Sequence, residues 1–198
     1  MKVIGLAGQF CSGKDTVAKM FARAGLKIID ADKLGHSVLR SLPVRKKLLS
    51  YFGKGITGPS GAIDRRRLAK HAFKDKRTAR ALCAITHPPL VKKIRNRLRG
   101  IGLRSPDAVV VINAAVFLEM GLLKDVDLLV VVKARASQLA GRAGSKWGMS
   151  PKEAFARVRL QMPLKRLVKA ADFIIDNSGT IEKTRKQVAL IRRHLWKS

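Results

Sequence analysis

The pattern G-x-x-x-x-G-K near the amino terminus constrains the fold more than any other feature, and Gly8, Gly13 and Lys14 meet it. An apolar run at residues 3–7 predicts a buried strand before it, and a helical pattern follows over about residues 14–24. Glycines in such a loop let the backbone curl so that its N–H groups point at phosphate oxygens, and the helix start adds positive potential. The sequence therefore predicts a nucleotide site, with Lys14 reaching the β- and γ-phosphates and with cofactor-binding residues Gly8, Cys11, Ser12, Gly13, Lys14, Asp15 and Thr16.

Strand-like apolar runs alternate with helical patterns along the rest of the chain. Further strands are expected at residues 26–29, 109–116, 128–132 and 173–175. Helices are expected over most of residues 34–99, apart from a Gly-rich loop at 53–61, and at about 150–161 and 180–196. This alternation predicts an α/β chain with the three-layer P-loop nucleoside-triphosphate hydrolase fold, a parallel five-stranded sheet flanked by helices. We expect a single domain, 1–198, with a helical substrate-binding insertion at approximately 34–100 and a short lid at approximately 140–165.

The balance of charge is the unusual feature of the composition. There are 42 Lys and Arg residues against 13 Asp and Glu, a net charge of +29. The excess fits nucleic acid, polyanionic small molecules, or a bias of the whole proteome with no site attached. Because the cations are scattered and aromatic residues are only 5% of the chain, we do not expect nucleic-acid binding as the main role.

Cellular location is read from what the sequence carries at its amino terminus and along its apolar runs. The chain opens directly on a strand pattern, without the architecture of a signal peptide, and no apolar run approaches the length of a membrane span. Cys11 and Cys83 form no metal or redox spacing, so no disulfide framework is expected. We expect a cytoplasmic protein with no membrane partner, and no oligomeric state follows from the sequence.

The residue after Lys14 departs from the usual motif. A Ser or Thr hydroxyl normally stands there and contacts Mg²⁺, but this chain has Asp15 followed by Thr16. A carboxylate is also a hard oxygen ligand, so Asp15 is a candidate metal ligand. The alternative is that Asp15 only caps the helix amino terminus, where acidic residues are favoured.

A pair of carboxylates follows the second predicted strand. Asp30 and Asp32 fall at the carboxyl edge of the sheet, where ligands of such folds bind. A carboxylate there can accept the proton of an acceptor hydroxyl as the γ-phosphoryl group moves. Taken alone, such a pair caps a helix as often as it serves catalysis.

Several further segments complete a pattern that spans nearly the whole chain. In order they are the P-loop, residues 29–32, residues 61–65 with Leu68 and Phe73, His87-Pro88, residues 118–122, Gln138 with Arg142, Glu153-Ala154 with Arg157 and Gln161, and residues 171–179. In this order the sequence resembles the dephospho-coenzyme A kinase family. The resemblance implies ATP-dependent phosphorylation of the ribose 3′-hydroxyl of dephospho-CoA, the last step of coenzyme A synthesis, with ATP and Mg²⁺ as cofactors and dephospho-CoA as the small-molecule partner.

The resemblance also implies roles for individual residues. Asp32 would be the catalytic base, and Arg142 would be a lid arginine that reaches the transferring phosphates. Asn177 and Gly179 would border the adenine of ATP, and the acceptor-binding residues would be Asp32, Arg65 and His87. Three alternatives stay open: Arg142 is solvated, His87 orients a helix entrance, and Asp64 with Arg65 forms a local capping pair.

Two departures from the family's pattern bear on this site. The third strand usually carries an Asp, and here the residue is Asn113, so we hypothesise that the carboxylate has moved from that strand to Asp15. Lys146 stands near the place of a second lid arginine, and a lysine offers a point charge rather than a bidentate fork. Two rival functions fit the motifs as well: a P-loop kinase for nucleosides or nucleoside monophosphates, and a noncatalytic or nucleic-acid-associated relative.

Overall fold

The computed structural model describes residues 1–197, which divide into two compact units. The first unit comprises Met1–Asp30 and the chain from Arg97 onward, and the second unit comprises Ala31–Asn96. A long helix, α5 (Lys76–Arg104), belongs to both units, because the boundary falls within it.

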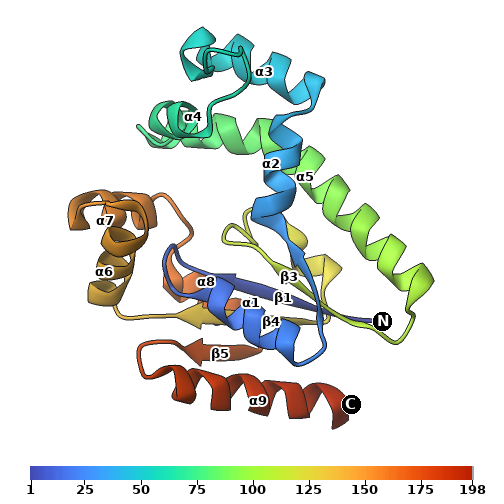
Figure 1. Ribbon diagram of the computed structural model, residues 1–198. Coiled ribbons are helices and arrows are strands. Elements are labelled where there is room, and N and C mark those ends of the chain that lie inside the picture. Colours follow the sequence, from blue (N-terminus) through green and yellow to red (C-terminus); the bar gives the residue numbers. More distant parts are fainter. Residues whose placement is uncertain (198) are drawn as a thin grey trace. The chain divides into compact units, whose positions relative to one another are not determined.

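The first unit is built on a five-stranded parallel sheet with the strand order β2-β3-β1-β4-β5 (Figure 1). Its strands are β1 (Lys2–Gly8), β2 (Lys27–Asp30), β3 (Val109–Asn113), β4 (Leu128–Lys133) and β5 (Phe173–Asp176). The central strands are almost wholly apolar and buried, as expected for parallel strands that are covered on both faces. The predicted fold class is confirmed, and β1 lies in the middle of the sheet.

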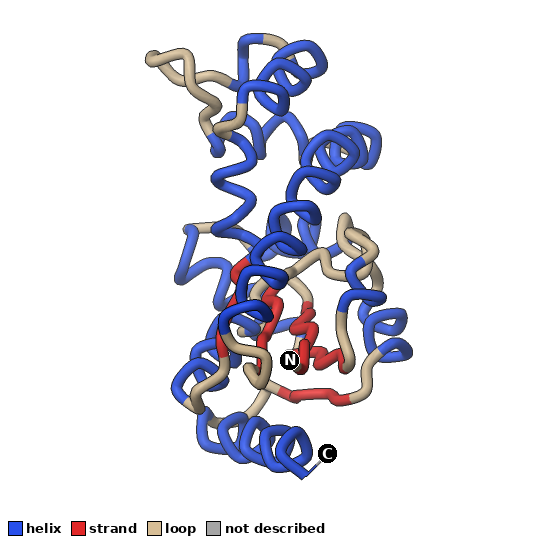
Figure 2. The backbone as a smooth tube through the Cα atoms, turned by 90° about the vertical axis from the view of Figure 1, so that its right-hand side faces the viewer, coloured by secondary structure: helices blue, strands red, loops and turns tan. Residues whose placement is uncertain are grey.

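Helices flank the strands (Figure 2). Those of the first unit, besides the last turns of α5, are α1 (Lys14–Arg23), α6 (Ala136–Trp147), α7 (Pro151–Arg159), α8 (Leu164–Ala170), α9 (Ile181–Lys197) and the 3₁₀ turn η2 (Leu122–Asp125). α1 and α9 pack together with one face of the sheet, where Phe21 and Ile191 join a cluster around Leu6. Alternate residues of the strands point to the other face, where the phenyl ring of Phe117 closes over Gly5.

The third strand is shorter than expected. It ends at Asn113 rather than at residue 116, although the residues that follow are apolar. After Ala114, whose amide still donates to the Leu6 carbonyl at 3.0 Å, the chain folds into turns. Phe117 is fully buried there. The apolar character of residues 114–117 therefore reflects burial within a turn, and an apolar run alone does not distinguish the two.

Two helices were not predicted from the sequence, namely α6 and α8. α6 contains Gly141 and Gly144, which weaken a helical pattern, and it ends at Gly148 with φ of 66°. α8 has only seven residues. The predicted helix at about 150–161 is confirmed as α7, which begins with a capping box between Ser150 and Glu153.

The second unit is helical. It consists of α2 (Ala31–Leu39), α3 (Leu42–Phe52), the 3₁₀ turn η1 (Lys54–Ile56), α4 (Arg65–Ala72) and the first turns of α5. The loop expected at residues 53–61 is present apart from η1, and Gly53 and Gly61 both have positive φ. The carboxylate of Asp64 accepts the backbone N–H groups of Arg66 and Arg67 at 2.8 and 3.0 Å, which confirms that Asp64 caps α4.

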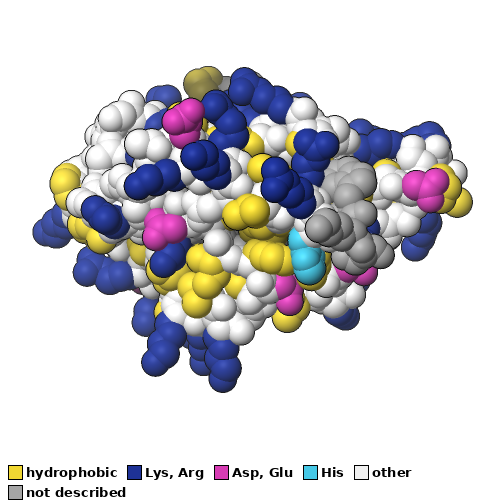
Figure 3. All heavy atoms as spheres, turned by 90° about the horizontal axis from the view of Figure 1, so that it is seen from below, with side chains coloured by type: hydrophobic (Ala, Val, Ile, Leu, Met, Phe, Trp, Pro, Cys, Tyr) yellow, Lys and Arg dark blue, Asp and Glu magenta, His cyan; other side chains and the backbone are white. Residues whose placement is uncertain are grey.

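Many of the described carboxylates accept hydrogen bonds from the backbone. At least seven acidic side chains accept a backbone N–H: Asp64, Asp75, Glu119, Asp127, Glu153, Asp172 and Asp176. Lys and Arg side chains are spread over the face shown in Figure 3, with few carboxylates among them. None of the helices in residues 1–197 has the length and apolar character that a membrane span requires.

Candidate active site

The loop between β1 and α1, residues 8–14, is called the phosphate loop from here on. Two of its glycines are required by close approach: a Cβ on Gly8 would lie 2.5 Å from the Val132 carbonyl oxygen, and one on Gly13 would lie 2.0 Å from Nδ2 of Asn177. Gly13 has φ of 91°, and Cys11 has φ of 62°, which is rare for a residue with a side chain. The sharp curl predicted for a loop that presents its amides to phosphate is therefore present.

Lys14 and Asp15 begin α1. Nζ of Lys14 lies 3.1 Å from Oδ1 of Asp15, and Nζ of Lys146, from α6, lies 3.8 Å from the other carboxylate oxygen. The residue at the amino-terminal cap of α1 is Gly13, while the carboxylate of Asp15 engages side chains. Burial by itself would raise the pKa of Asp15, but the charge of Lys14 and hydrogen bonds from Asn113 and Lys14 outweigh it and lower that pKa. Asp15 is therefore a carboxylate at neutral pH.

Asn113 ends β3 between two other strands. It is paired in register with Leu6 of β1 and with Asp30 of β2. Its Nδ2 donates to Oδ1 of Asp15 at 3.1 Å, and its own Oδ1 is buried and accepts no hydrogen bond from residues 1–197. An acceptor oxygen in this condition, next to a carboxylate, suits a cation or a donor that arrives with a ligand.

These oxygens fit a magnesium ion. Carboxylate and amide oxygens are the hard ligands that Mg²⁺ takes, usually with only one or two from the protein. Within the described chain no three His, Cys, Asp or Glu side chains gather in one place, so most ligands of an ion beside Asp15 would be phosphate oxygens and water.

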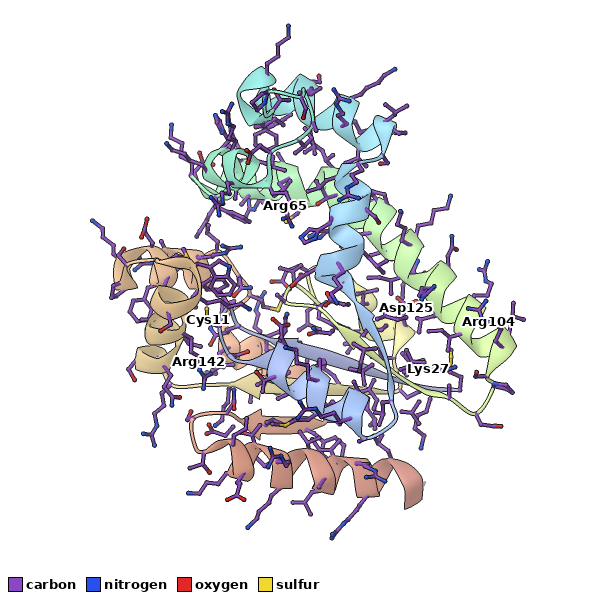
Figure 4. The ribbon with its side chains drawn as sticks, in the orientation of Figure 1. Cys11, Lys27, Arg65, Arg104, Asp125 and Arg142 are labelled. Carbon is purple, nitrogen blue, oxygen red and sulfur yellow. The ribbon has the colours of Figure 1, made fainter. Side chains whose placement is uncertain are left out.

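Arg142 of α6 reaches the phosphate loop (Figure 4). Its Nη1 donates to the carbonyl oxygens of Cys11 and Ser12 at 3.2 and 3.1 Å, and its Nη2 donates to the carbonyl of Asn177 at 2.8 Å. The alternative in which Arg142 is solvated is therefore wrong. In this structure its guanidinium joins α6 to two loops.

The predicted lid region also contacts the phosphate loop through Phe10, which the sequence analysis did not single out. The Phe10 amide donates to Oε1 of Gln161 at 2.7 Å, and its ring lies 5.1 Å from the ring of Trp147. The guanidinium of Arg157 lies over the Phe10 ring, 4.5 Å from its centre. Trp147 is half exposed and packs its ring against Phe10. In the sequence, the only feature that links Trp147 to the site is its closeness to Arg142.

Burial raises the pKa of the Cys11 thiol, although Lys146, Arg157 and Arg142 oppose this with their charges. The thiol is therefore protonated at neutral pH. It contributes its backbone carbonyl, rather than a reactive sulfur, to the contacts described above.

Asn177 and Gly179 follow β5. Asn177 is buried, and its Nδ2 donates to the Ser12 carbonyl at 2.9 Å. Its Oδ1 accepts the hydroxyl of Thr184 at 2.8 Å, and its backbone N–H donates to the Lys133 carbonyl at 2.8 Å. Gly179 lies in the turn before α9. Thr184, a fully buried polar residue, was missed because a threonine within a helical pattern carries no signal of its own.

The remaining predicted residues belong to the second unit. Asp32 is the second residue of α2, directly after the strand that ends at Asp30. Arg65 begins α4, and its Nη1 lies 3.1 Å from Nδ1 of His36. The alternative in which His87 orients a helix entrance is wrong, because α5 begins at Lys76 and continues through both prolines.

These features define a class: the chain is a P-loop kinase, in which the loop after the central strand holds nucleotide phosphates and basic side chains stand around it. A family model described as Dephospho-CoA kinase matches residues 2–183, and the chain belongs to that family. The Dephospho-CoA kinase of Aquifex aeolicus is 42% identical over 196 residues, which covers 98% of both chains.

Solved structures agree with this assignment at the level of the fold. The crystal structure of TT1252 from Thermus thermophilus has a TM-score of 0.79 and 27% identity, covering 98% of this chain and 97% of that one. The Dephospho-CoA kinase from Campylobacter jejuni has a TM-score of 0.71 at 24% identity, covering 100% and 98%.

Proposed function

We propose that this protein transfers the γ-phosphate of ATP to the ribose 3′-hydroxyl of dephospho-CoA, giving coenzyme A and ADP as the last step of coenzyme A synthesis in the cytoplasm. The observation that carries the proposal is the match to the Dephospho-CoA kinase model over residues 2–183, which includes the phosphate loop. Relatives of that name match this chain almost end to end.

The nucleotide would bind at the phosphate loop. Gly8, Cys11, Ser12, Gly13 and Thr16 would surround its phosphates, and Asn177 and Gly179 would border the adenine. Lys14 would neutralise charge on the β- and γ-phosphates. Mg²⁺ would supply charge neutralisation for the phosphates, and Asp15, with the Asn113 oxygen beside it, would hold it.

The acceptor would bind to the second unit. Asp32 would take the proton of the ribose hydroxyl as the phosphoryl group leaves ATP, so that the oxygen attacks as it loses that proton. Arg65 and His87 would hold the acceptor's phosphates, and the dense positive charge of this unit suits them. Residues of about 140–165 would act as the lid, with Arg142 and Lys146 supplying positive charge while water is excluded.

A substrate panel tests the proposal. ADP release is measured with ATP, Mg²⁺ and one acceptor at a time: dephospho-CoA, adenosine, the four nucleoside monophosphates, and no acceptor. Release that depends on dephospho-CoA, with the phosphate found at the 3′ position, is expected. Faster ADP release with a nucleoside or nucleotide would identify that compound, rather than dephospho-CoA, as the acceptor.

A further inference from the structure

The side chain of Asn177 has its hydrogen-bonding groups committed within the protein. Nδ2 donates to the Ser12 carbonyl and Oδ1 accepts from Thr184, so the two ends of the amide point to different elements. The side chain is buried, and it lies so close to Gly13 that a Cβ on Gly13 would be 2.0 Å from Nδ2 of Asn177. In this conformation Asn177 connects α9 to the phosphate loop.

Thr184 holds the oxygen end of that amide. Its hydroxyl lies 2.8 Å from Oδ1 of Asn177 and 3.4 Å from the Thr180 carbonyl. An O–H group can donate to only one acceptor well, and the shorter contact is the one to Asn177. The Ser12 carbonyl can only accept, so it takes the NH₂ group of Asn177, and the Thr184 hydroxyl anchors the oxygen at the opposite end of the amide.

The Ser12 carbonyl is consequently held from two sides. It accepts from Asn177 at 2.9 Å and from Nη1 of Arg142 at 3.1 Å. The Ser12 carbonyl and the Gly13 N–H belong to one planar trans peptide and point in opposite directions. Holding the carbonyl therefore fixes the direction of the Gly13 N–H, one of the amides that phosphate loops offer to the nucleotide.

We propose that Thr184 is a positioning residue for nucleotide binding: through Asn177 it fixes the Ser12–Gly13 peptide so that the Gly13 N–H faces the nucleotide phosphates. The inference rests on the proposed function only in that a nucleotide binds the phosphate loop, and it holds for any acceptor. Thr184 itself touches no substrate.

Thr184→Val tests this, because valine keeps the shape and removes the hydroxyl. Oδ1 of Asn177 then lacks its donor, the amide is anchored at one end only, and the affinity for ADP is expected to fall about tenfold. Thr184→Ser keeps the hydroxyl, so its affinity for ADP should be within about twofold of the parent value. The KM for dephospho-CoA should stay within about twofold of the parent value in both variants. The matched control is Thr86→Val in α5, whose hydroxyl donates to the Leu82 carbonyl of its own helix at 2.8 Å. ADP affinity is measured by calorimetry, and thermal unfolding is followed for each variant.

A double-variant cycle separates positioning from general loss of structure. If Thr184 acts through Asn177, Thr184→Val should weaken ADP binding no further in the presence of Asn177→Ala. Because ADP binding needs no turnover, a wrong acceptor would leave this test intact. ADP affinity of Thr184→Val within about twofold of the parent would overturn the proposal, as would failure of Thr184→Ser to restore it or additive losses in the double variant. If Thr184→Val does not fold, the comparison of Thr184→Ser with Asn177→Ala decides: equal losses of affinity would also overturn it.

Discussion

Nδ2 of Asn113 lies 3.1 Å from Oδ1 of Asp15, so the amide that ends β3 donates to the carboxylate in the first turn of α1. These are the two positions at which the sequence departs from the expected metal-binding pattern. A P-loop enzyme commonly holds its magnesium with a hydroxyl after the loop lysine and a strand carboxylate. Contact between Asp15 and Asn113 is what an exchange of the carboxylate between the two positions requires.

The exchange predicts how variants respond to magnesium. Asp15→Asn should weaken the dependence of the steady-state rate on Mg²⁺ and lower activity by roughly 10–100-fold, because a charged ligand is lost. Asp15→Ser restores the common hydroxyl but leaves no carboxylate, so it should also lose activity, and Asn113→Asp in addition should regain much of it. Steady-state rates across a Mg²⁺ titration compare the single and double variants.

Two outcomes would contradict the exchange. The effects of Asp15→Ser and Asn113→Asp could simply add, with no rescue in the double variant. Alternatively, Asp15→Asn could leave the Mg²⁺ titration unchanged, as a capping role predicts, because Asn caps about as well as Asp.

Acid should diminish the stabilising contribution of Asp15. Its pKa is lowered in the folded protein, so its contribution is present above the unfolded-state value of about 3.9 and is lost as the pH falls through the folded value. Asp15→Asn removes that dependence. The difference in unfolding free energy between the parent and Asp15→Asn should therefore shrink as urea titrations move from neutral to acid pH, and a difference that does not change with pH would contradict the assigned charge.

Lys14→Ala should cost far more in turnover than in folding. The ammonium group neutralises charge that builds on the transferring phosphoryl group, and loss of one such contact lowers the rate about 10²–10³-fold. Lys19→Ala, on the exposed side of the same helix, is the control and should retain activity. Full activity of Lys14→Ala with dephospho-CoA would show that the phosphate loop has no role in catalysis.

Asp32→Asn should separate binding from chemistry. The amide keeps the shape of the carboxylate but accepts no proton, so ATP affinity should persist while phosphoryl transfer falls by roughly 10²-fold or more. Asp30→Asn is the matched variant. A loss in Asp30→Asn with none in Asp32→Asn would assign the base to the other carboxylate.

Gly13→Ala and Gly25→Ala form a pair that isolates the contact with Asn177. Both glycines have nearly the same φ, 91° and 93°, so both alanines should cost about 1–2 kcal/mol of backbone strain. A Cβ on Gly25 meets nothing within 4 Å, whereas one on Gly13 meets Nδ2 of Asn177 at 2.0 Å. Gly13→Ala should therefore lower the unfolding free energy further and abolish nucleotide binding; equal unfolding free energies for the two variants would contradict the contact.

The sequence predicted the sheet and the phosphate loop because both depend on local pattern. Apolar runs bounded by turns marked all five strands, and the spacing of Gly8, Gly13 and Lys14 placed the loop between a strand and a helix. The end of β3 at Asn113 was not predictable, because buried turns and buried strands share the same composition. Local patterning also missed α6, whose glycines weaken the helical signal.

Contacts between residues far apart in the sequence could not be predicted from local sequence patterns. The contacts of Thr184 with Asn177, and of Phe10 with Trp147, join residues whose types suit ordinary packing as well. The exchange between Asp15 and Asn113 could be suspected only because both residues break an expected pattern. The structure adds that their side chains meet.

With 42 Lys and Arg residues against 13 Asp and Glu, the chain carries too few carboxylates to offset its cations. Most of the Lys and Arg side chains therefore repel one another across the surface, and this repulsion favours any expansion of the chain. Anions in the buffer supply the negative charge that the acidic side chains do not provide. The melting temperature of this protein should consequently rise as the ionic strength of the buffer rises, whereas a surface stabilised by ion pairs would respond in the opposite direction.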